Sequence, residues 1–251
     1  MKNTIQEYAI EIKDLTVRYH NTIALDKANI KIPFGTFNGV IGMNGAGKST
    51  LFKAITGLAH PTSGDVLVSG KTAHQAQKLG LVAYVPQSEL VDWDFPVSVY
   101  DVVMMGRYGT QNILKIPRAE DHKKVEEALV KVGMHDFKDR QIGELSGGQK
   151  KRVFVARALA QEAEILLLDE PFAGVDAKSE RSLTMLLVSL KEEGKTIILS
   201  THELTSLSEY CDYVALVKNT VLAYGPTAEV FTHDLVSQTF DGAVHRIQFK
   251  N

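Results

Sequence analysis

Two glycine-containing segments of the sequence carry residue types that bind nucleotide phosphates. The first, residues 42–50, reads Gly-Met-Asn-Gly-Ala-Gly-Lys-Ser-Thr and follows the apolar run 37–41. A glycine loop between a strand and a helix lets backbone N–H groups surround phosphates, while the lysine reaches the terminal phosphates and the serine hydroxyl binds Mg²⁺. The residues of this glycine loop expected to contact the nucleotide are Gly42, Asn44, Gly45, Ala46, Gly47, Lys48, Ser49 and Thr50.

The second segment, residues 145–149, reads Leu-Ser-Gly-Gly-Gln and precedes a basic and then an apolar-periodic stretch. We predict that a helix starts here with Ser146 as its cap, because the free N–H groups and positive dipole end of a helix N-terminus favour an anion. Two phosphate-contacting segments in one chain indicate a nucleotide held between two surfaces. The residues of this LSGGQ segment are Leu145, Ser146, Gly147, Gly148 and Gln149.

Acidic and polar residues follow three apolar runs that are expected to be strands. Asp169 and Glu170 end the run 165–168, and the carboxyl ends of strands in α/β sheets present ligand-binding groups. Asp169 is predicted to hold Mg²⁺, directly or through water, and Glu170 to act as general base for an attacking water. His202 follows the run 196–200, where it could contact the terminal phosphate and position the water and Glu170.

Gln87 follows the strand-like stretch 81–86. Its side chain could reach Mg²⁺ or the water when two parts of the protein close, although a polar loop residue without a function would look the same in the sequence.

Together these segments resemble the ATP-binding subunit of ABC transporters over nearly the whole chain. The resemblance implies ATP and Mg²⁺ as cofactors and catalytic roles for Lys48, Glu170 and His202. It implies Mg²⁺ binding by Ser49, Gln87 and Asp169. It also makes the LSGGQ segment the family signature, places Asp176 in the D-loop at 173–176, and matches Tyr19 to an aromatic residue that stacks on adenine.

Tyr19 could equally be a strand residue on a sheet surface. Two departures from the family pattern are small. Met43 stands where proline is usual, and Ala173-Gly174 replaces a common Ser-Ala pair, but neither removes a charged or phosphate-contacting side chain.

In this family the signature of one chain meets the glycine loop of another. The resemblance therefore implies a head-to-tail homodimer around two ATP molecules, with two-fold symmetry. Nucleotide binding would bring the chains together and hydrolysis would release them.

The resemblance also predicts the architecture. We expect an α/β fold with a P-loop NTPase core of the RecA type, an antiparallel β subdomain and an inserted α-helical subdomain. The single domain would span residues 1–251, with the core and β subdomain at about 1–87 and 163–251 and the helical subdomain at about 88–162. Helices are expected at 97–107, at 118–132 and after the LSGGQ segment, and one more at 227–231 or longer.

Composition limits the compartment and the partners. The net charge of −2 gives no basic field for nucleic acid. Cys211 is the single cysteine, which excludes a disulfide framework and a cysteine-based zinc site and suits a reducing compartment. Neither a signal peptide nor an apolar run of about 18 residues is evident. We therefore expect a cytoplasmic protein, peripheral on the inner face of the cell membrane.

The stretch 88–109 bears on what is transported. Its sequence resembles that of the ATPases of bacterial manganese, zinc and iron importers. This implies import of a divalent metal ion through integral membrane permease subunits, with an extracytoplasmic metal-binding protein as an indirect partner. Trp93, Phe95 and Met104 could line the groove that receives the permease, or could be core of the helical subdomain. The eight histidines show no ligand spacing, so this chain is not expected to bind the transported metal.

Three alternatives remain from the sequence. The chain could serve a haem or iron-chelate importer, which only the stretch 88–109 argues against. It could be a soluble, non-transport ABC ATPase, but those usually have two such domains or a long coiled coil. It could be a P-loop kinase, in which the LSGGQ segment and His202 would have no purpose.

Overall fold

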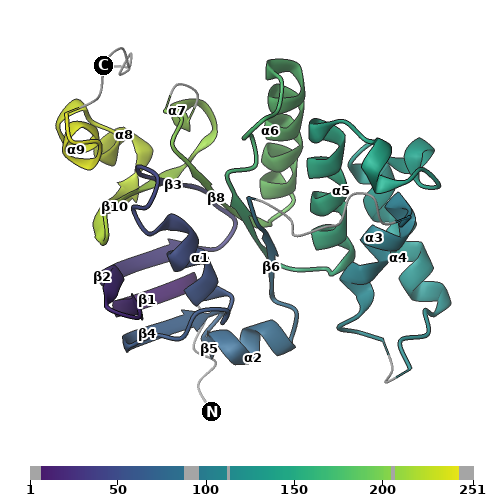
Figure 1. Cartoon of the computed structure of the whole chain (residues 1–251), viewed down its shortest axis with the longest axis horizontal. Coiled ribbons are helices and arrows are strands. Elements are labelled where there is room, and N and C mark those ends of the chain that lie inside the picture. The colour runs from purple at the N-terminus through teal and green to yellow at the C-terminus, as the bar shows by residue number, and fades with distance from the viewer. Residues whose placement is uncertain (1–6, 88–95, 112–113, 205–206, 243–251) are drawn as a thin grey trace.

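The strands of the protein form two sheets in the computed structural model, which describes residues 7–87, 96–111, 114–204 and 207–242 (Figure 1). Among the described residues one sheet is four-stranded, in the order β2-β1-β4-β5, and its neighbouring strands are antiparallel. The other is six-stranded, in the order β10-β9-β3-β8-β7-β6. The strands of the first sheet are β1 (Tyr8–Tyr19), β2 (Thr22–Pro33), β4 (Ser63–Val68) and β5 (Lys71–Thr72). Those of the second are β3 (Phe37–Ile41), β6 (Val82–Val85), β7 (Ile165–Asp169), β8 (Thr196–Thr201), β9 (Tyr213–Val217) and β10 (Val221–Pro226).

The six-stranded sheet is parallel from β9 to β6, and only its edge strand β10 is antiparallel. Every residue of β3, β7 and β8 is buried, as expected for parallel strands that are covered on both faces. Side chains alternate between two hydrophobic cores. Leu166 and Leu168 face the core shared with α5 and α6, whereas Ile165 and Leu167 face the core under α1 and the antiparallel sheet.

Helix α1 (Lys48–Ile55) follows the glycine loop and packs against both sheets. Helix α6 (Ala177–Glu192) covers the opposite face of the six-stranded sheet. The short helices α2 (Ala73–Lys78) and α7 (Leu207–Tyr210) connect strands. An α/β fold with an additional antiparallel sheet was expected from the sequence, and it is confirmed.

Between β6 and β7, the residues that the structure describes form helices and 3₁₀ turns but no strand of the sheets. They include α3 (Val99–Met104), α4 (Ala119–Lys131), α5 (Gly147–Ala160) and the 3₁₀ turns η1 (Met105–Arg107), η2 (His135–Phe137) and η3 (Ile142–Glu144). The expected helix at 97–107 is wrong at its start, because Ser98 caps α3 and accepts a hydrogen bond from Asp101 N at 3.1 Å. It is also wrong at its end, where 3₁₀ geometry replaces the last turn.

Two other helix boundaries differ from the expected ones. Helix α4 starts one residue late, after Arg118, whose N–H donates to Asp121 Oδ2 at 2.9 Å. The C-terminal region, as far as it is described (to residue 242), carries two helices rather than one, α8 (Thr227–Val230) and α9 (His233–Thr239). The backbone of Phe231, at φ −81° and ψ 64°, is not helical and separates them.

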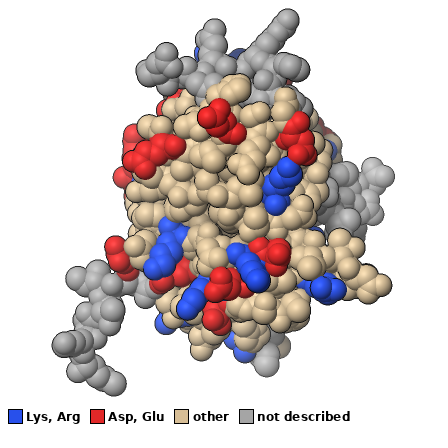
Figure 2. Space-filling model, turned by 90° about the vertical axis from the view of Figure 1, so that its left-hand side faces the viewer, with Lys and Arg blue, Asp and Glu red and all other residues tan. Residues whose placement is uncertain are grey.

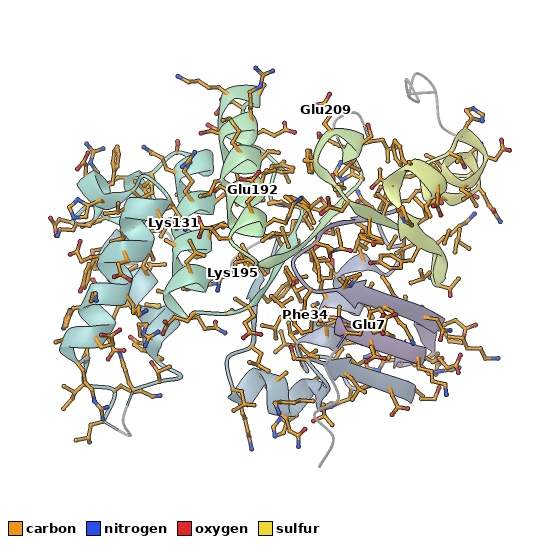
Figure 3. The ribbon with its side chains drawn as sticks, turned by 180° about the vertical axis from the view of Figure 1, so that it is seen from behind. Glu7, Phe34, Lys131, Glu192, Lys195 and Glu209 are labelled. Atoms are coloured by element: carbon orange, nitrogen blue, oxygen red, sulfur yellow. The ribbon has the colours of Figure 1, made fainter. Side chains whose placement is uncertain are left out.

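The helical region and the sheet meet along a seam that is visible from behind (Figure 3). Lys131 at the end of α4 forms an ion pair with Glu193, just past α6. Lys195 donates to Ala163 O at 2.7 Å, and burial lowers the pKa of its ammonium group. Met104 is buried in the main core, whereas Trp93 and Phe95 lie outside the described residues.

Candidate nucleotide site

The glycine loop joins the end of β3 to the start of α1, as its strand–loop–helix context predicted. Gly47 has φ +102°, and a Cβ at this position would lie 2.7 Å from Ala24 O, so only glycine fits. The loop is held by Ala46, whose N–H donates to Met43 O at 3.1 Å and whose carbonyl accepts from Asn219 N at 2.8 Å. The first-turn N–H groups of α1 have no partner within the helix and are available to an anion.

A cavity of about 280 Å³ opens at this loop. Its lining joins the loop to groups from two further strand ends. The lining residues are Ala24, Asn44, Gly45, Ala46, Gly47, Lys48, Ser49, Thr50, Gln87 and Glu170. The structure therefore collects most of the predicted phosphate-contacting residues around one space, together with the predicted general base.

Lys48 is buried at the base of this cavity and is 5% exposed. Its Nζ donates to Gly42 O at 2.8 Å and to Met43 O at 3.1 Å, and lies 3.5 Å from Glu170 Oε1. A buried ammonium group needs such partners, because an unpaired buried charge is costly. The same group can donate to phosphate oxygens without leaving the cavity.

Glu170 is the centre of the polar contacts in the site. Gln87 Nε2 donates to Glu170 Oε2 at 2.7 Å, and His202 Nδ1 lies 3.3 Å from Glu170 Oε1. The glutamate itself has φ +47°, a conformation that is unfavourable for a side chain with a Cβ and that occurs preferentially at functional sites. Its N–H is held by Ser200 O at 3.1 Å and Ser200 Oγ at 3.0 Å. Ser200 on the neighbouring strand thus fixes the backbone position of Glu170.

Asp169 is 3% exposed and lies behind the cavity rather than in its lining. Tyr84 OH donates to its Oδ2 at 3.1 Å, and Ser200 Oγ donates to its Oδ1. Sequence reasoning missed both partners. These two partners could be predicted only from the order of the strands, because β7 pairs with β6, which carries Tyr84, on one side and with β8 on the other. Ser200 of β8 lies directly opposite Asp169 in this pairing. Sequence reasoning also missed Lys151, whose Nζ donates to Gln87 O at 3.1 Å.

The LSGGQ segment starts α5 as predicted, with Ser146 as the cap. Ser146 Oγ accepts from Gln149 N at 3.3 Å, and Gln149 Oε1 accepts from Ser146 N at 2.9 Å. Gly148 lies close to α6, because a Cβ there would be 2.7 Å from the Cβ of Ser179. The LSGGQ segment does not contribute to the lining of the cavity at the glycine loop.

Four further predicted site residues also lie outside that lining: Gly42, His202, Asp176 and Tyr19. Asp176 caps α6, accepting from Lys178 N at 3.1 Å and Ser179 N at 3.0 Å. Hydrogen bonds from the side chain and backbone of Ser179 hold the pKa of the Asp176 carboxyl below its usual value. Tyr19 lies at the end of β1, where it is 44% exposed.

Comparison with known proteins decides the family. The model of the ABC transporter family matches residues 25–173, a stretch that holds the glycine loop, Gln87, the LSGGQ segment and Glu170. The chain belongs to the ABC transporter family. The family membership inferred from the sequence motifs is therefore confirmed, and the ATPase cassettes of this family share the fold described above.

Several members of the family are similar over most of their length. The manganese transport system ATP-binding protein MntA of Synechocystis is 51% identical over 243 residues, covering 96% of this chain and 94% of that protein. The zinc transport system ATP-binding protein TroB of Treponema pallidum is 44% identical, covering 96% and 90%. Among solved structures, an ABC transporter in an inward-facing conformation has a TM-score of 0.83 at 27% identity, covering 93% of this chain and 89% of that one.

Proposed function

We propose that this ABC protein hydrolyses ATP to drive import of a divalent metal ion, either manganese, zinc or iron, through a separate membrane permease. The observation that carries the proposal is similarity over nearly the whole chain to ATP-binding subunits named for manganese and zinc transport. A chelated iron transport system protein of Yersinia pestis is also 51% identical, covering 94% of this chain and 80% of that protein. The alternatives of a haem or iron-chelate importer and of a soluble, non-transport ABC ATPase are not favoured, because the other relatives named here are manganese and zinc transport proteins; the Yersinia pestis protein is the one whose name fits the iron-chelate alternative.

Glu170 is the general base in the proposed mechanism. Its carboxylate borders the cavity beside Lys48, so it can take a proton from a water at the terminal phosphate. Gln87 and His202 contact the two carboxylate oxygens and orient them, which supports catalytic or positioning roles for both. The ammonium group of Lys48 can exchange its carbonyl partners for phosphate oxygens and stabilise the charge that develops there.

The residues of the site fit Mg²⁺. Ser49 and Gln87 line the cavity with a hydroxyl and an amide, and Asp169 supplies a carboxylate from the adjacent strand end. These are hard oxygen donors, which Mg²⁺ prefers. Because Asp169 lies behind the lining, we propose that it acts through water. Bound Mg²⁺ would neutralise charge on the phosphates.

We further propose that two chains form the complete sites. In one chain the LSGGQ segment lies on the far side of the β7–α6 connection from the glycine loop, against Ser179 of α6. A second chain, placed head to tail, would bring its own LSGGQ segment to this cavity. The dimeric structure of MJ0796, a bacterial ABC transporter cassette, supports the formation of a dimer, with a TM-score of 0.73 at 26% identity, covering 86% of this chain and 98% of that one. We propose that Tyr19 stacks on adenine and that Asp176 faces the dimer interface.

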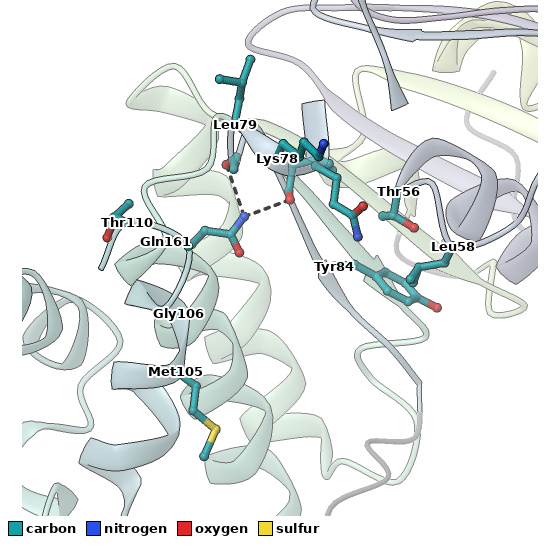
Figure 4. A pocket seen from close by; sticks show the side chains of 13 residues that line it. Thr56, Leu58, Lys78, Leu79, Tyr84, Met105, Gly106, Thr110 and Gln161 are labelled. Carbon is teal, nitrogen blue, oxygen red and sulfur yellow. Dashed lines mark hydrogen bonds between the residues drawn. The ribbon is translucent and has the colours of Figure 1, made fainter. Parts of the chain in front are cut away.

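A second cavity, of about 410 Å³, supports docking of a permease (Figure 4). It lies between the helical region and the sheet, with Leu58, Lys78, Leu79 and Tyr84 on one side and Met105 on the other. Leu58 is 59% exposed and Leu79 60%, so apolar surface is available at its rim. An apolar helix of the permease would bury this surface.

None of the described helices is long and apolar enough to span a lipid bilayer. We therefore propose that the protein reaches the inner face of the membrane through the permease, and that an extracytoplasmic metal-binding protein is an indirect partner. Acidic and basic side chains are interspersed on the face shown in Figure 2, and the net charge is −2, which favours no role with nucleic acid.

Lys48→Ala is expected to weaken ATP binding by about 10- to 100-fold, since a charge-assisted hydrogen bond contributes about 1.5–3 kcal/mol. A titration of the isolated chain with a fluorescent ATP analogue would measure the change. Lys53→Ala is a matched control, because Lys53 lies on the same helix but is exposed. Equal affinity in wild type and Lys48→Ala would remove Lys48 from phosphate binding.

The proposed function is tested by the metal content of cells. Cells that lack the gene are compared with cells complemented by wild type or by Glu170→Gln, under limiting manganese, zinc or iron. We expect a selective fall in one metal that only the wild-type gene restores. Unchanged content of all three metals in the deletion strain would contradict metal import.

A further inference from the structure

Arg107 is a buried cation at the centre of the helical region and has no part in the mechanism proposed above. It ends η1, is 4% exposed, and its guanidinium contacts two other helices. Nε donates to Asp121 Oδ1 on α4 at 3.0 Å. Nη1 donates to Ala160 O, at the last residue of α5, at 2.7 Å, and to Glu162 Oε2 at 2.8 Å. One side chain therefore joins η1, α4 and the end of α5.

The partners of Arg107 are themselves tied to the same helices. Asp121 uses its other oxygen to accept from Arg118 N, which fixes the start of α4. Glu162 also pairs with Lys124 of α4 at 2.7 Å. The hydrogen bond from Arg118 N is the main reason that the pKa of Asp121 lies below its usual value, and Arg107 adds to the lowering. Arg107, Asp121, Glu162 and Lys124 form an ion cluster. Its charge-assisted hydrogen bonds are directional as well as strong.

The backbone next to Arg107 is in direct contact with α5. A Cβ at Gly106 would lie only 2.2 Å from Arg157 O, so η1 and α5 approach more closely than any residue other than glycine would allow here. Sliding of η1 along α5 would require this contact and the bond to Ala160 O to break together. The packing and the ion cluster thus restrict the same motion.

These residues border the cavity to which we assign permease docking. Met105, Gly106, Gly109 and Thr110 form one side of it, and we call this side the helical wall. The Oγ1 of Thr110 donates to Arg107 O at 2.9 Å. The helical wall is therefore attached to Arg107 both through the residues that precede it in the chain and through Thr110, which follows it.

Gln161 connects the same end of α5 to the opposite side of the cavity. Its Nε2 donates to Gly80 O at 3.2 Å and to Val82 O at 3.0 Å, and Figure 4 shows its amide directed toward that side. The C-terminal end of α5 therefore lies between the two sides of the cavity. The N-terminal end of the same helix carries the LSGGQ segment.

We propose that Arg107 is a positioning residue that makes the helical wall and α5 one rigid unit, so that contact at the cavity sets the orientation of the LSGGQ segment. The link to the permease rests on the proposed function, whereas the rigidity of the unit does not. A buried ion cluster suits this task, because its fixed geometry specifies orientation even where it adds little stability.

The rigidity is tested with the isolated full chain, free of nucleotide. Spin labels are placed at Tyr108→Cys, on an exposed residue beside the helical wall, and at Lys150→Cys near the start of α5. The native Cys211 is buried and is not expected to react. Arg107→Lys keeps the charge but cannot keep all three bonds. Asp121→Asn is a second variant in case the first does not fold.

We expect a narrow label-to-label distance distribution in wild type, and one at least twice as broad in Arg107→Lys or Asp121→Asn. Lys123→Gln, an exposed charge on α4, is the control and should match wild type. An equally narrow distribution in both test variants would overturn the proposal.

The link to the permease is tested with the assembled transporter in liposomes, by measuring ATPase activity and manganese uptake. Arg107→Lys is compared with wild type both as the isolated chain and in the assembled transporter. It should lower permease-dependent stimulation and uptake by at least about 5-fold. Full stimulation of the ATPase activity by the permease would overturn a role of Arg107 in transmitting permease contact to the LSGGQ segment. An equal loss of ATPase activity in the isolated chain would overturn it as well. A wild-type transporter that moves no manganese, zinc or iron would instead count against the proposed function, and the distance measurement would still decide the rigidity of the unit.

Discussion

Glu170→Gln is expected to lower ATP hydrolysis by about 100- to 10,000-fold, the range typical for removal of a general base. The substitution keeps the size of the side chain and its hydrogen bond from Gln87, so the site should stay folded. It removes the negative charge 3.5 Å from Lys48 Nζ, so the ammonium group can be shared more fully with phosphates. ATP affinity is therefore expected to be equal to that of wild type or higher.

Phosphate release and size-exclusion chromatography in the presence of ATP check this expectation. With hydrolysis blocked, the chains should accumulate as an ATP-bound dimer, whereas wild type should return to monomer as ATP is consumed. Glu192→Gln, an exposed residue on α6, is the matched control and should behave as wild type. Normal turnover by Glu170→Gln would remove Glu170 as the base, and the search would turn to His202.

The local parts of the site could be predicted because their signals lie within a few residues of one another. The start of α5 at Ser146 needs only the cap and the Gln149 side chain three residues later. The glycine loop likewise needs only its own residues and the adjoining strand and helix. The same local chemistry explains one wrong boundary, since Ser98 and Asp101 form a capping box inside the stretch expected to be helical.

The contacts around the carboxylates could not be predicted, because they depend on which strands are neighbours. Tyr84 and Ser200 reach Asp169 only because β6 and β8 flank β7 in the sheet. The residues around Tyr84 and Ser200 in the sequence do not indicate this order of the strands. The contact of Gln87 with Glu170 was not predicted, because the sequence indicated only that the Gln87 side chain could reach Mg²⁺ or the water. The Arg107 cluster gave no sequence signal, since its partners are 14 and 55 residues away.

Ser146→Arg is expected to spare ATP binding by the single chain and to abolish hydrolysis. Ser146 is exposed and lies outside the lining of the cavity at the glycine loop, so the arginine should not disturb nucleotide binding there. In a head-to-tail dimer the same position would face the nucleotide of the other chain, where a bulky cation replaces a small cap. Ser146→Asn, which keeps the helix cap, separates this effect from the loss of capping, which costs about 1 kcal/mol.

Mixing two inactive variants gives the sharper test of the composite site. A chain with Lys48→Ala has a defective glycine loop, and a chain with Ser146→Arg has a defective LSGGQ segment. If sites form between chains, a mixed dimer pairs both defects in one site and leaves the other site intact. Random pairing of equal amounts should then restore about a quarter of the wild-type rate, provided that the two sites act independently. If each site were complete within one chain, mixing would restore no activity, because every chain would carry its own defect. Recovery upon mixing therefore distinguishes a shared site from a self-contained one without relying on the effect of either substitution alone.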